Sequence, residues 1–125
     1  MSSPAKILVV DDDEEIGIML QMILEHKGFS VIILKRTEQA EETMSRHTIS
    51  LVILDMLIAG VKGTDVCMRL KANSNTAHIP VMMITALPEA EEICKQAGAD
   101  DFLNKPFELD SLITKINLLL NKILI

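Results

Sequence analysis

LVILDMLIAG, residues 51–60, sets a carboxylate at the end of a strand-like apolar run. Residues 51–54 are the kind of continuous hydrophobic stretch that is typical of a parallel strand covered on both faces. Asp55 follows this stretch directly, and apolar residues occupy positions 56–59 after it. Because a carboxylate buried without partners is costly, we interpret Asp55 as a functional residue at the end of a strand.

Similar apolar runs recur along the chain and alternate with helical patterns. They span residues 7–10, 31–34 and 81–84, with a weaker fifth run at residues 102–103. Between these runs, apolar residues recur every three or four positions, which predicts helices. The first has Ile16, Met19, Leu20, Ile23 and Leu24 on one face and ends at Gly28, and the second runs from Glu38 to about Arg46 with Thr37 as its cap. The third covers about residues 64–72, the fourth runs from Pro88 to Gly98, and the fifth has an apolar stripe from Leu109 to Ile123. This alternation predicts a single α/β domain, a doubly wound parallel sheet of five strands covered by five helices.

The composition limits the classes of function. A chain of 125 residues with 49% hydrophobic and 2% aromatic residues suits one domain with a largely aliphatic core. The net charge of −6 argues against non-specific binding to nucleic acid or to an anionic membrane. Cys67 and Cys94 stand far apart, no signal-peptide pattern is evident, and no apolar run reaches the roughly 20 residues that cross a bilayer. We therefore expect a cytoplasmic protein.

Polar side chains follow all five predicted strands, but Lys35 and Arg36 after the second strand have no obvious partner in the set. Three aspartates at residues 11–13 follow the first strand, Asp55 the third, Thr85 the fourth and Lys105 the fifth. Ligands of doubly wound sheets bind beyond the carboxyl ends of the strands, so we expect these groups to meet. Clustered carboxylates favour a hard cation such as Mg²⁺, which takes carboxylate and phosphate oxygens, and lysine and threonine suit phosphoryl oxygens. The set predicts phosphoryl transfer onto Asp55 as the nucleophile.

These residues, at their spacing, resemble the receiver domain of the bacterial response-regulator family. The matching segments are Ile7–Asp12, Leu51–Asp55, Gly63, Thr85-Ala86, Ala97–Asp100 and Lys105–Phe107. The resemblance covers residues 5–123 and implies a flavodoxin-like sheet with strand order 2-1-3-4-5. It also implies a phospho-accepting signalling domain rather than a turnover enzyme. Its donor would be a histidine kinase or a histidine phosphotransfer domain, and its output surface the fourth helix, fifth strand and fifth helix.

The resemblance assigns the acceptor and the metal ligands. Asp55 would be the phosphoryl acceptor. Asp11 and Asp12 would be the acidic pair that holds Mg²⁺ (with Mn²⁺ as the alternative ion), together with Asp55 and the backbone carbonyl of Leu57. Gly63, eight residues after the acceptor, would be a structural residue of the site.

The resemblance also assigns the residues that bind and report the phosphoryl group. Thr85 would be the switch hydroxyl, with Ala86 beside it, and Lys105 would pair with the phosphoryl group. Phe102 would be the switch aromatic, whose position packing alone should set. The Lys105–Pro106 peptide is expected to be cis, as it commonly is in this family.

The chain departs from the family pattern in the segment after the acceptor. Ile58-Ala59 stands where many members carry Met-Pro, so the loop keeps Gly60 and Gly63 but lacks proline's rigidity. Lys62 replaces a common Asp. The segment between Thr85 and Gly98 is slightly shorter than in many members, and in the resembling family this segment belongs to the output surface.

Simpler interpretations exist for each residue taken alone. Residues 11–13 suit a helix N-cap, Thr85 a strand-end hydroxyl bound to backbone, and Phe102 a core position. A phosphatase of the haloacid dehalogenase type would need a general acid two residues after Asp55, where the chain has Leu57. A phosphorylation-independent adaptor would not need the intact acceptor, acidic pair, threonine and lysine.

Two hypotheses concern exposed apolar residues. Ile18 and Met22 lie four apart, opposite the predicted buried face of the first helix, and are expected to form an exposed docking patch for the histidine-phosphorylated donor. Leu57 and Leu87 lie two residues after Asp55 and Thr85. In the resembling family these positions flank the phosphoryl group, so two leucines there predict slow self-dephosphorylation.

Two alternatives exist for the output. No output domain follows residue 125, so the chain is either a stand-alone regulator or part of a longer one. The end of the sequence, Lys122-Ile123-Leu124-Ile125, is unusually apolar and favours a longer chain or a dimer contact. A phosphorylation-dependent dimer is a further expectation. We expect a downstream protein or an attached output domain as the partner, and no direct contact of this domain with nucleic acid or a membrane.

Overall fold

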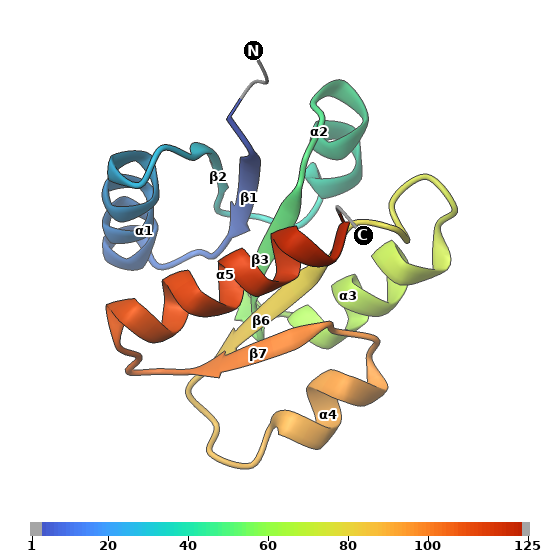
Figure 1. Ribbon diagram of the computed structural model, residues 1–125. Helices are drawn as coiled ribbons and strands as arrows, with labels where there is room; N and C mark the ends of the chain where they lie inside the picture. Colours follow the sequence, from blue (N-terminus) through green and yellow to red (C-terminus); the bar gives the residue numbers. More distant parts are fainter. Residues whose placement is uncertain (1–3, 124–125) are drawn as a thin grey trace.

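A five-stranded parallel sheet forms the centre of the molecule (Figure 1). The computed structural model describes residues 4–123 of the chain. The sheet has the order β2-β1-β3-β6-β7, made of β1 (Lys6–Val10), β2 (Ser30–Leu34), β3 (Leu51–Asp55), β6 (Val81–Thr85) and β7 (Asp101–Asn104). In order along the chain these are strands 2-1-3-4-5, so the predicted doubly wound, flavodoxin-like fold is confirmed.

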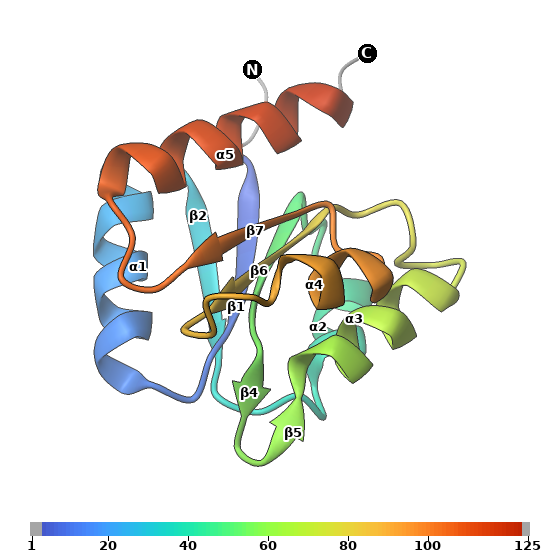
Figure 2. The ribbon, with the colours of Figure 1, turned by 90° about the horizontal axis from the view of Figure 1, so that it is seen from below.

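Five helices cover the two faces of the sheet. They are α1 (Glu14–His26), α2 (Ala40–Arg46), α3 (Gly63–Ala72), α4 (Glu91–Gln96) and α5 (Leu109–Ile123). Figure 2 shows α1 and α5 on one side of the sheet and α2, α3 and α4 on the other. Each face has its own buried cluster: Leu20 and Ile116 belong to the first, and Met44, Val66 and Cys94 to the second. In residues 4–123, none of these helices has the length and hydrophobicity that a bilayer span requires.

Burial of the strands follows their place in the sheet. The apolar residues of the three central strands are all almost fully buried. Every residue of β2 is only half-buried, because β2 lies at the edge of the sheet and pairs with β1 alone. The prediction of burial on both faces therefore holds for the central strands and is wrong for β2.

Three details of the helices differ from the sequence prediction. In α1, Met19 is 39% exposed and Gly17 is buried instead. The buried face of the helix is therefore rotated about the helix axis relative to the predicted face. Helix α2 begins at Ala40 without a side-chain cap, and Thr37 contributes only its carbonyl, which accepts from the Ala40 N–H. Helix α4 begins at Glu91, because Pro88 lies in a turn outside it.

The segment after the acceptor forms a small hairpin that the sequence pattern did not predict (Figure 2). Strands β4 (Leu57–Ile58) and β5 (Val61–Lys62) pair antiparallel, and Ala59 and Gly60 form the turn with φ of 51° and 83°. Positive φ at both central residues is what a two-residue hairpin turn of this type requires. The predicted cis Lys105–Pro106 peptide is confirmed. The side chains of residues 122–125, on which the expectation of a longer chain or a dimer contact rests, lie outside the described part.

Candidate functional site

Residues from four strand ends meet at one edge of the sheet. Asp11 follows β1, Asp55 ends β3, Thr85 ends β6 and Lys105 follows β7. Because all strands of a parallel sheet point the same way, their carboxyl ends reach the same edge. The Lys105 N–H donates to the Thr85 carbonyl over 2.7 Å, which ties the ends of β6 and β7 together.

Three carboxylates form the acidic part of the site. Asp11, Asp12 and Asp55 each offer an oxygen, and these three oxygens lie within 4.8 Å of one another. Asp11 is only 2% exposed, whereas Asp12 is exposed. Asp11 Oδ1 accepts from the Asp13 N–H over 2.9 Å, but the buried Oδ2 of Asp11 has no hydrogen-bond donor among the described residues. A buried oxygen without a hydrogen bond is rare, and its nearest cationic group, Lys105 Nζ at 3.5 Å, is an ion-pair neighbour rather than a hydrogen-bond donor.

Lys105 balances the buried negative charge. Its Nζ donates to Asp55 Oδ1 over 3.1 Å and makes a longer ion-pair contact of 3.5 Å with Asp11 Oδ2. Burial raises the pKa of Asp11, and the neighbouring charge of Asp55 adds to this shift. Burial opposes the charge of Lys105, but its contacts with Asp55 and Asp11 outweigh that effect and raise the pKa of Lys105. Lys105 therefore stays charged between two carboxylates.

The three consecutive aspartates have separate tasks. Asp13 is the N-cap of α1, and its side chain accepts from the Glu15 and Ile16 N–H groups. Asp12 instead reaches the hairpin turn, where its Oδ2 accepts from the Ala59 N–H over 2.9 Å. The capping interpretation thus applies to Asp13, and Asp11 and Asp12 remain available to the acidic cluster.

The acidic cluster fits a small hard cation. Carboxylate oxygens at this separation, one of them buried and without a donor, are the ligands that Mg²⁺ takes from proteins, usually with retained waters and phosphate oxygens. A cation would satisfy Asp11 Oδ2 and offset the repulsion between Asp11 and Asp55. Cys67 and Cys94 are buried elsewhere in the core, and burial raises the pKa of the Cys67 thiol to about 11, so neither is suited as a ligand here.

Gly63 makes the close approach of α3 to the acceptor strand possible. A Cβ at this position would lie 2.0 Å from the carbonyl oxygen of Asp55 and 2.9 Å from Met56 Cα. The Gly63 N–H donates to the Met56 carbonyl over 2.7 Å. The hydrogen bond holds the segment that follows the acceptor, and the short distances from a Cβ to backbone atoms leave no room for a side chain at position 63.

Thr85 and Phe102 lie on the neighbouring strands β6 and β7. Thr85 is 1% exposed, and its Oγ1 accepts from the Leu87 N–H over 3.0 Å, the backbone contact expected of a strand-end hydroxyl. Phe102 is half-buried against the cluster that contains Ala90 and Cys94. Lys115 Nζ lies 5.7 Å from the centre of its ring and 3.0 Å from Asp101 Oδ1. The Phe102 ring therefore has the Lys115 ammonium beside it as well as its apolar packing contacts.

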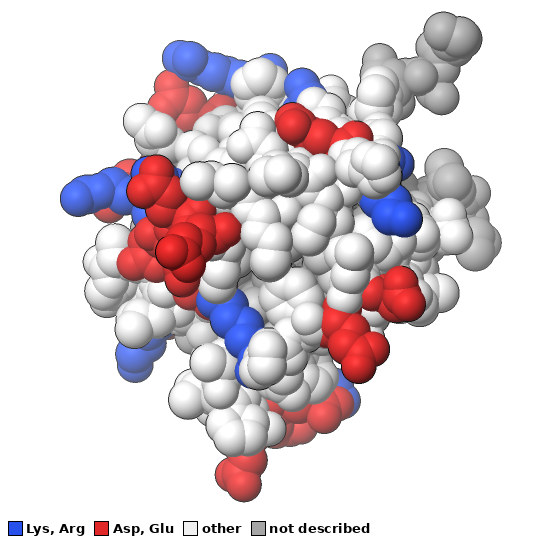
Figure 3. Space-filling model, turned by 90° about the vertical axis from the view of Figure 1, so that its left-hand side faces the viewer, with Lys and Arg blue, Asp and Glu red and all other residues white. Residues whose placement is uncertain are grey.

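An apolar hollow borders the site between α1 and the start of α5. It measures about 470 Å³ and is lined by Ile16, Met19, Ile23, Ala86, Lys105, Pro106, Phe107 and Leu109. Figure 3 shows this side of the molecule, where a largely uncharged surface meets a group of acidic side chains. The sequence does not predict this hollow, because the spacing of Met19 is that of a buried residue, whereas its side chain is 39% exposed.

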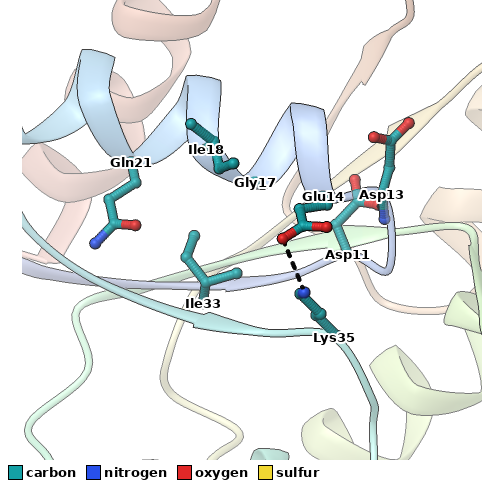
Figure 4. Close-up of a pocket in the computed structure, with 8 residues that line it drawn as sticks. All are labelled: Asp11, Asp13, Glu14, Gly17, Ile18, Gln21, Ile33 and Lys35. Atoms are coloured by element: carbon teal, nitrogen blue, oxygen red, sulfur yellow. Dashed lines mark hydrogen bonds and ion pairs between the residues drawn. The ribbon is translucent and has the colours of Figure 1, made fainter.

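Ile18 and Met22 are exposed, as predicted, and each borders a hollow on the surface of α1. Their exposed fractions are 53% and 68%. Ile18 borders a hollow of about 160 Å³ between α1 and β2, beside Gly17 and Ile33 (Figure 4). Met22 borders another hollow, next to Leu109. The two side chains lie one turn apart on the exposed side of α1 and border different hollows.

Comparisons with known proteins agree with this geometry. The family described as "Response regulator receiver domain" matches residues 7–117. The phosphate regulon transcriptional regulatory protein PhoB of Rhizobium meliloti is 34% identical over 119 residues, which cover 94% of this chain and 52% of that protein. RpaA of Synechocystis, described as a DNA-binding dual master transcriptional regulator, is 32% identical over 94% of this chain and 49% of its own length. The chain thus spans about half the length of the curated relatives it matches.

A solved structure agrees in fold over almost the whole chain. The BeF₃-activated N-terminal receiver domain of Klebsiella pneumoniae RstA superposes with a TM-score of 0.84 at 27% identity, covering 92% of this chain and 97% of that one. With the family match over residues 7–117, the strand order and the acidic edge of the sheet, these comparisons identify the chain as a member of the response-regulator receiver-domain family of two-component signalling proteins.

Proposed function

We propose that residues 5–123 form a receiver domain that takes a phosphoryl group onto Asp55 from a histidine kinase or a histidine phosphotransfer domain. The observation that carries this proposal is the pairing of Asp55 with Lys105 beside a buried Asp11 whose second oxygen lacks a donor. A half-buried carboxylate that shares a lysine and a candidate cation site is suited to become an acyl phosphate.

The transfer follows from the groups around Asp55. A carboxylate oxygen of Asp55 attacks phosphorus, the bond from phosphorus to the donor's imidazole nitrogen breaks, and its electron pair returns to that nitrogen. Mg²⁺ or Mn²⁺, held by Asp11, Asp12, Asp55 and the Leu57 carbonyl, would supply neutralisation of charge on the phosphoryl oxygens. Lys105, which already contacts Asp55, exchanges this carboxylate contact for a phosphoryl oxygen.

The response to phosphorylation involves Thr85 and Phe102. The new phosphoryl group, beside Ala86, attracts the Thr85 hydroxyl, which then leaves the Leu87 N–H. This movement opens space for the Phe102 ring to turn inward, away from Lys115. The surface formed by α4, β7 and α5 changes as a result, and a partner or an attached output domain reads the change.

A phosphoryl mimic tests this function in the intact chain. Beryllofluoride with Mg²⁺ should shift amide resonances at Thr85, Phe102 and across the α4–β7–α5 surface. The Asp55→Asn variant should show no such shift, because it lacks the carboxylate that holds the mimic. Shifts confined to the acidic cluster would point to an adaptor that does not switch, and equal shifts in Asp55→Asn would exclude Asp55 as the acceptor.

The partners follow from the same proposal. The donor domain supplies a phosphohistidine, and the downstream target is a protein or an output domain attached to a longer chain, as the half-length match to the relatives allows. A phosphorylation-dependent dimer is a further part of this proposal. The cytoplasm, where such donors act, is the proposed location.

Docking of the donor is predicted to depend on the apolar surface of α1. Replacing Met19 with serine removes an apolar side chain from the hollow beside Lys105, so phosphoryl transfer from the donor should slow by about tenfold. The Ile18→Ser/Met22→Ser double variant tests the predicted patch on the same helix. Stopped-flow or quenched-flow transfer rates measure both, and phosphorylation by a small-molecule donor, which needs no docking, is the control that should not change.

The two docking surfaces give separate outcomes. Slow transfer in Met19→Ser alone would place the donor on the hollow between α1 and α5. Slow transfer in the double variant alone would place it on the Ile18 and Met22 side. If neither variant slowed transfer from the protein donor, docking through α1 would be wrong.

The lifetime of the phosphoryl group is predicted to depend on Leu57 and Leu87. Their side chains are 60% and 56% exposed, two residues beyond Asp55 and Thr85, and offer no polar group to an attacking water. Leu57→Asn or Leu87→Glu should speed hydrolysis by about an order of magnitude, because each can hold that water. Intact-mass measurement of the phosphorylated fraction over time gives the rate. Leu118→Asn, a change at a leucine of similar exposure on α5, is the control, and equal decay in all variants would contradict the prediction.

A further inference from the structure

The hairpin turn after the acceptor makes a direct contact with the acidic cluster. Asp12 Oδ2 accepts a hydrogen bond from the Ala59 N–H over 2.9 Å, and the two residues are 47 positions apart in the chain. Asp12 is exposed, and this is the one hydrogen bond of its side chain among the described residues. The orientation of the Asp12 carboxylate therefore depends on the hairpin turn.

The turn is held in place by its neighbours rather than by its own preference. Ile58, which precedes Ala59, is fully buried in the core cluster on the α3 side, and Gly63 anchors the other end of the segment through Met56. Ala59 has a φ of 51°, which residues with a side chain rarely adopt and which costs about 1 kcal/mol. This backbone conformation points the Ala59 N–H at Asp12.

We propose that the Ala59 N–H is a positioning group for the metal: it fixes Oδ2 of Asp12 so that the other oxygen of this carboxylate faces the cation. The proposal rests on the proposed function, because it concerns the same acidic site. A carboxylate ligand is oriented best when its second oxygen accepts a hydrogen bond from a fixed donor. Proline at position 59 would offer no N–H and would hold φ near −65°, so the contact exists here because the chain has alanine.

Substitutions at position 59 separate this role from general stability. Ala59→Pro removes both the donor and the positive φ, and it should weaken metal binding by about tenfold, the lower end of the effect of removing an outer partner of a metal ligand. Ala59→Gly keeps the N–H and adopts positive φ without strain, so it should bind the metal as tightly as the unaltered chain. Free Mn²⁺ in a titration of the whole chain, measured by electron paramagnetic resonance, gives the affinity without any phosphorylation step.

A second measurement does not require the proline variant to fold. The Ala59 amide should exchange with solvent at least tenfold faster in Asp12→Ala than in the unaltered chain, because its acceptor is gone. The proposal is overturned if Ala59→Pro binds Mn²⁺ as tightly as the unaltered chain, if Ala59→Gly binds as weakly as Ala59→Pro, or if the exchange rate does not change. If the unaltered chain itself bound no Mn²⁺, the proposed function would fail first, and the Ala59–Asp12 contact would then be no more than a structural hydrogen bond.

Discussion

Lys105→Met is expected to lower the free energy of unfolding of the metal-free protein by about 3 kcal/mol. Lys105 lies 3.1 Å from Asp55 and 3.5 Å from Asp11, and its side chain is only 20% exposed. Methionine has a similar length but no charge, so two neighbouring carboxylates, one of them 2% exposed, would be left without their cation. A buried charge that loses its partner costs far more than an exposed ion pair contributes.

Magnesium should restore most of the stability lost in Lys105→Met. A divalent cation bound by the same carboxylates takes over the balancing role, and binding to the folded state alone raises its stability. Thermal unfolding in chelator and in Mg²⁺ should therefore show a larger gain in Tm for Lys105→Met than for the unaltered chain. Lys95→Met, which removes an exposed lysine on α4, is the control and should change neither value appreciably. Equal stability of Lys105→Met and the unaltered chain in chelator would refute the account of charge balance.

Gly63→Ala is expected to destabilise the fold by more than about 3 kcal/mol. The added Cβ would lie 2.0 Å from the Asp55 carbonyl oxygen and 2.9 Å from Met56 Cα. Both are backbone atoms, which cannot turn aside as a flexible side chain does. Either the start of α3 moves away from β3, which breaks the 2.7 Å hydrogen bond from the Gly63 N–H to Met56, or the domain unfolds more readily.

Gly17→Ala provides the matched control for this prediction. Gly17 is also buried, but a Cβ there would meet only the Ile33 side chain, at an ordinary contact distance of 3.4 Å. Alanine favours the helix by about 1 kcal/mol over glycine, so this variant should be as stable as the unaltered chain or more so. Chemical denaturation measures both changes. A Gly63→Ala variant with unchanged stability and unchanged Mg²⁺ affinity would show that the close approach of α3 to β3 is not required.

Most of the fold was predictable because each central strand is a continuous apolar run that can be recognised in the sequence. Continuous runs such as Leu51–Leu54 are apolar on both faces, and their order with the helical patterns leaves few topologies for a parallel sheet. The site was predictable for the same reason: polar residues that end parallel strands must meet at one edge. The alternation of strands and helices was therefore enough to place residues 11, 55, 85 and 105 together.

The parts that the sequence did not reveal depend on contacts between distant segments. Met19 has the same hydrophobic signal as a core residue, and only the packing of α1 against β2 and α5 decides that Gly17 is buried instead. The turn at Ala59 and Gly60 interrupts an apolar stretch without an Asn-Gly or Asp-Gly pair, so no local signal marks the hairpin. The contact of Lys115 with Phe102 joins two elements and cannot be read from either one.

The most direct test of the central claim is the chemical identification of the phosphorylated residue. The chain is phosphorylated by its histidine donor in the presence of Mg²⁺, reduced with borohydride, which converts an aspartyl phosphate to homoserine, and digested for peptide mass spectrometry. The account predicts homoserine at position 55, and none at 11 or 12. Homoserine at another aspartate, or a phosphoryl group on a serine, threonine or histidine with Asp55 unmodified, would contradict it.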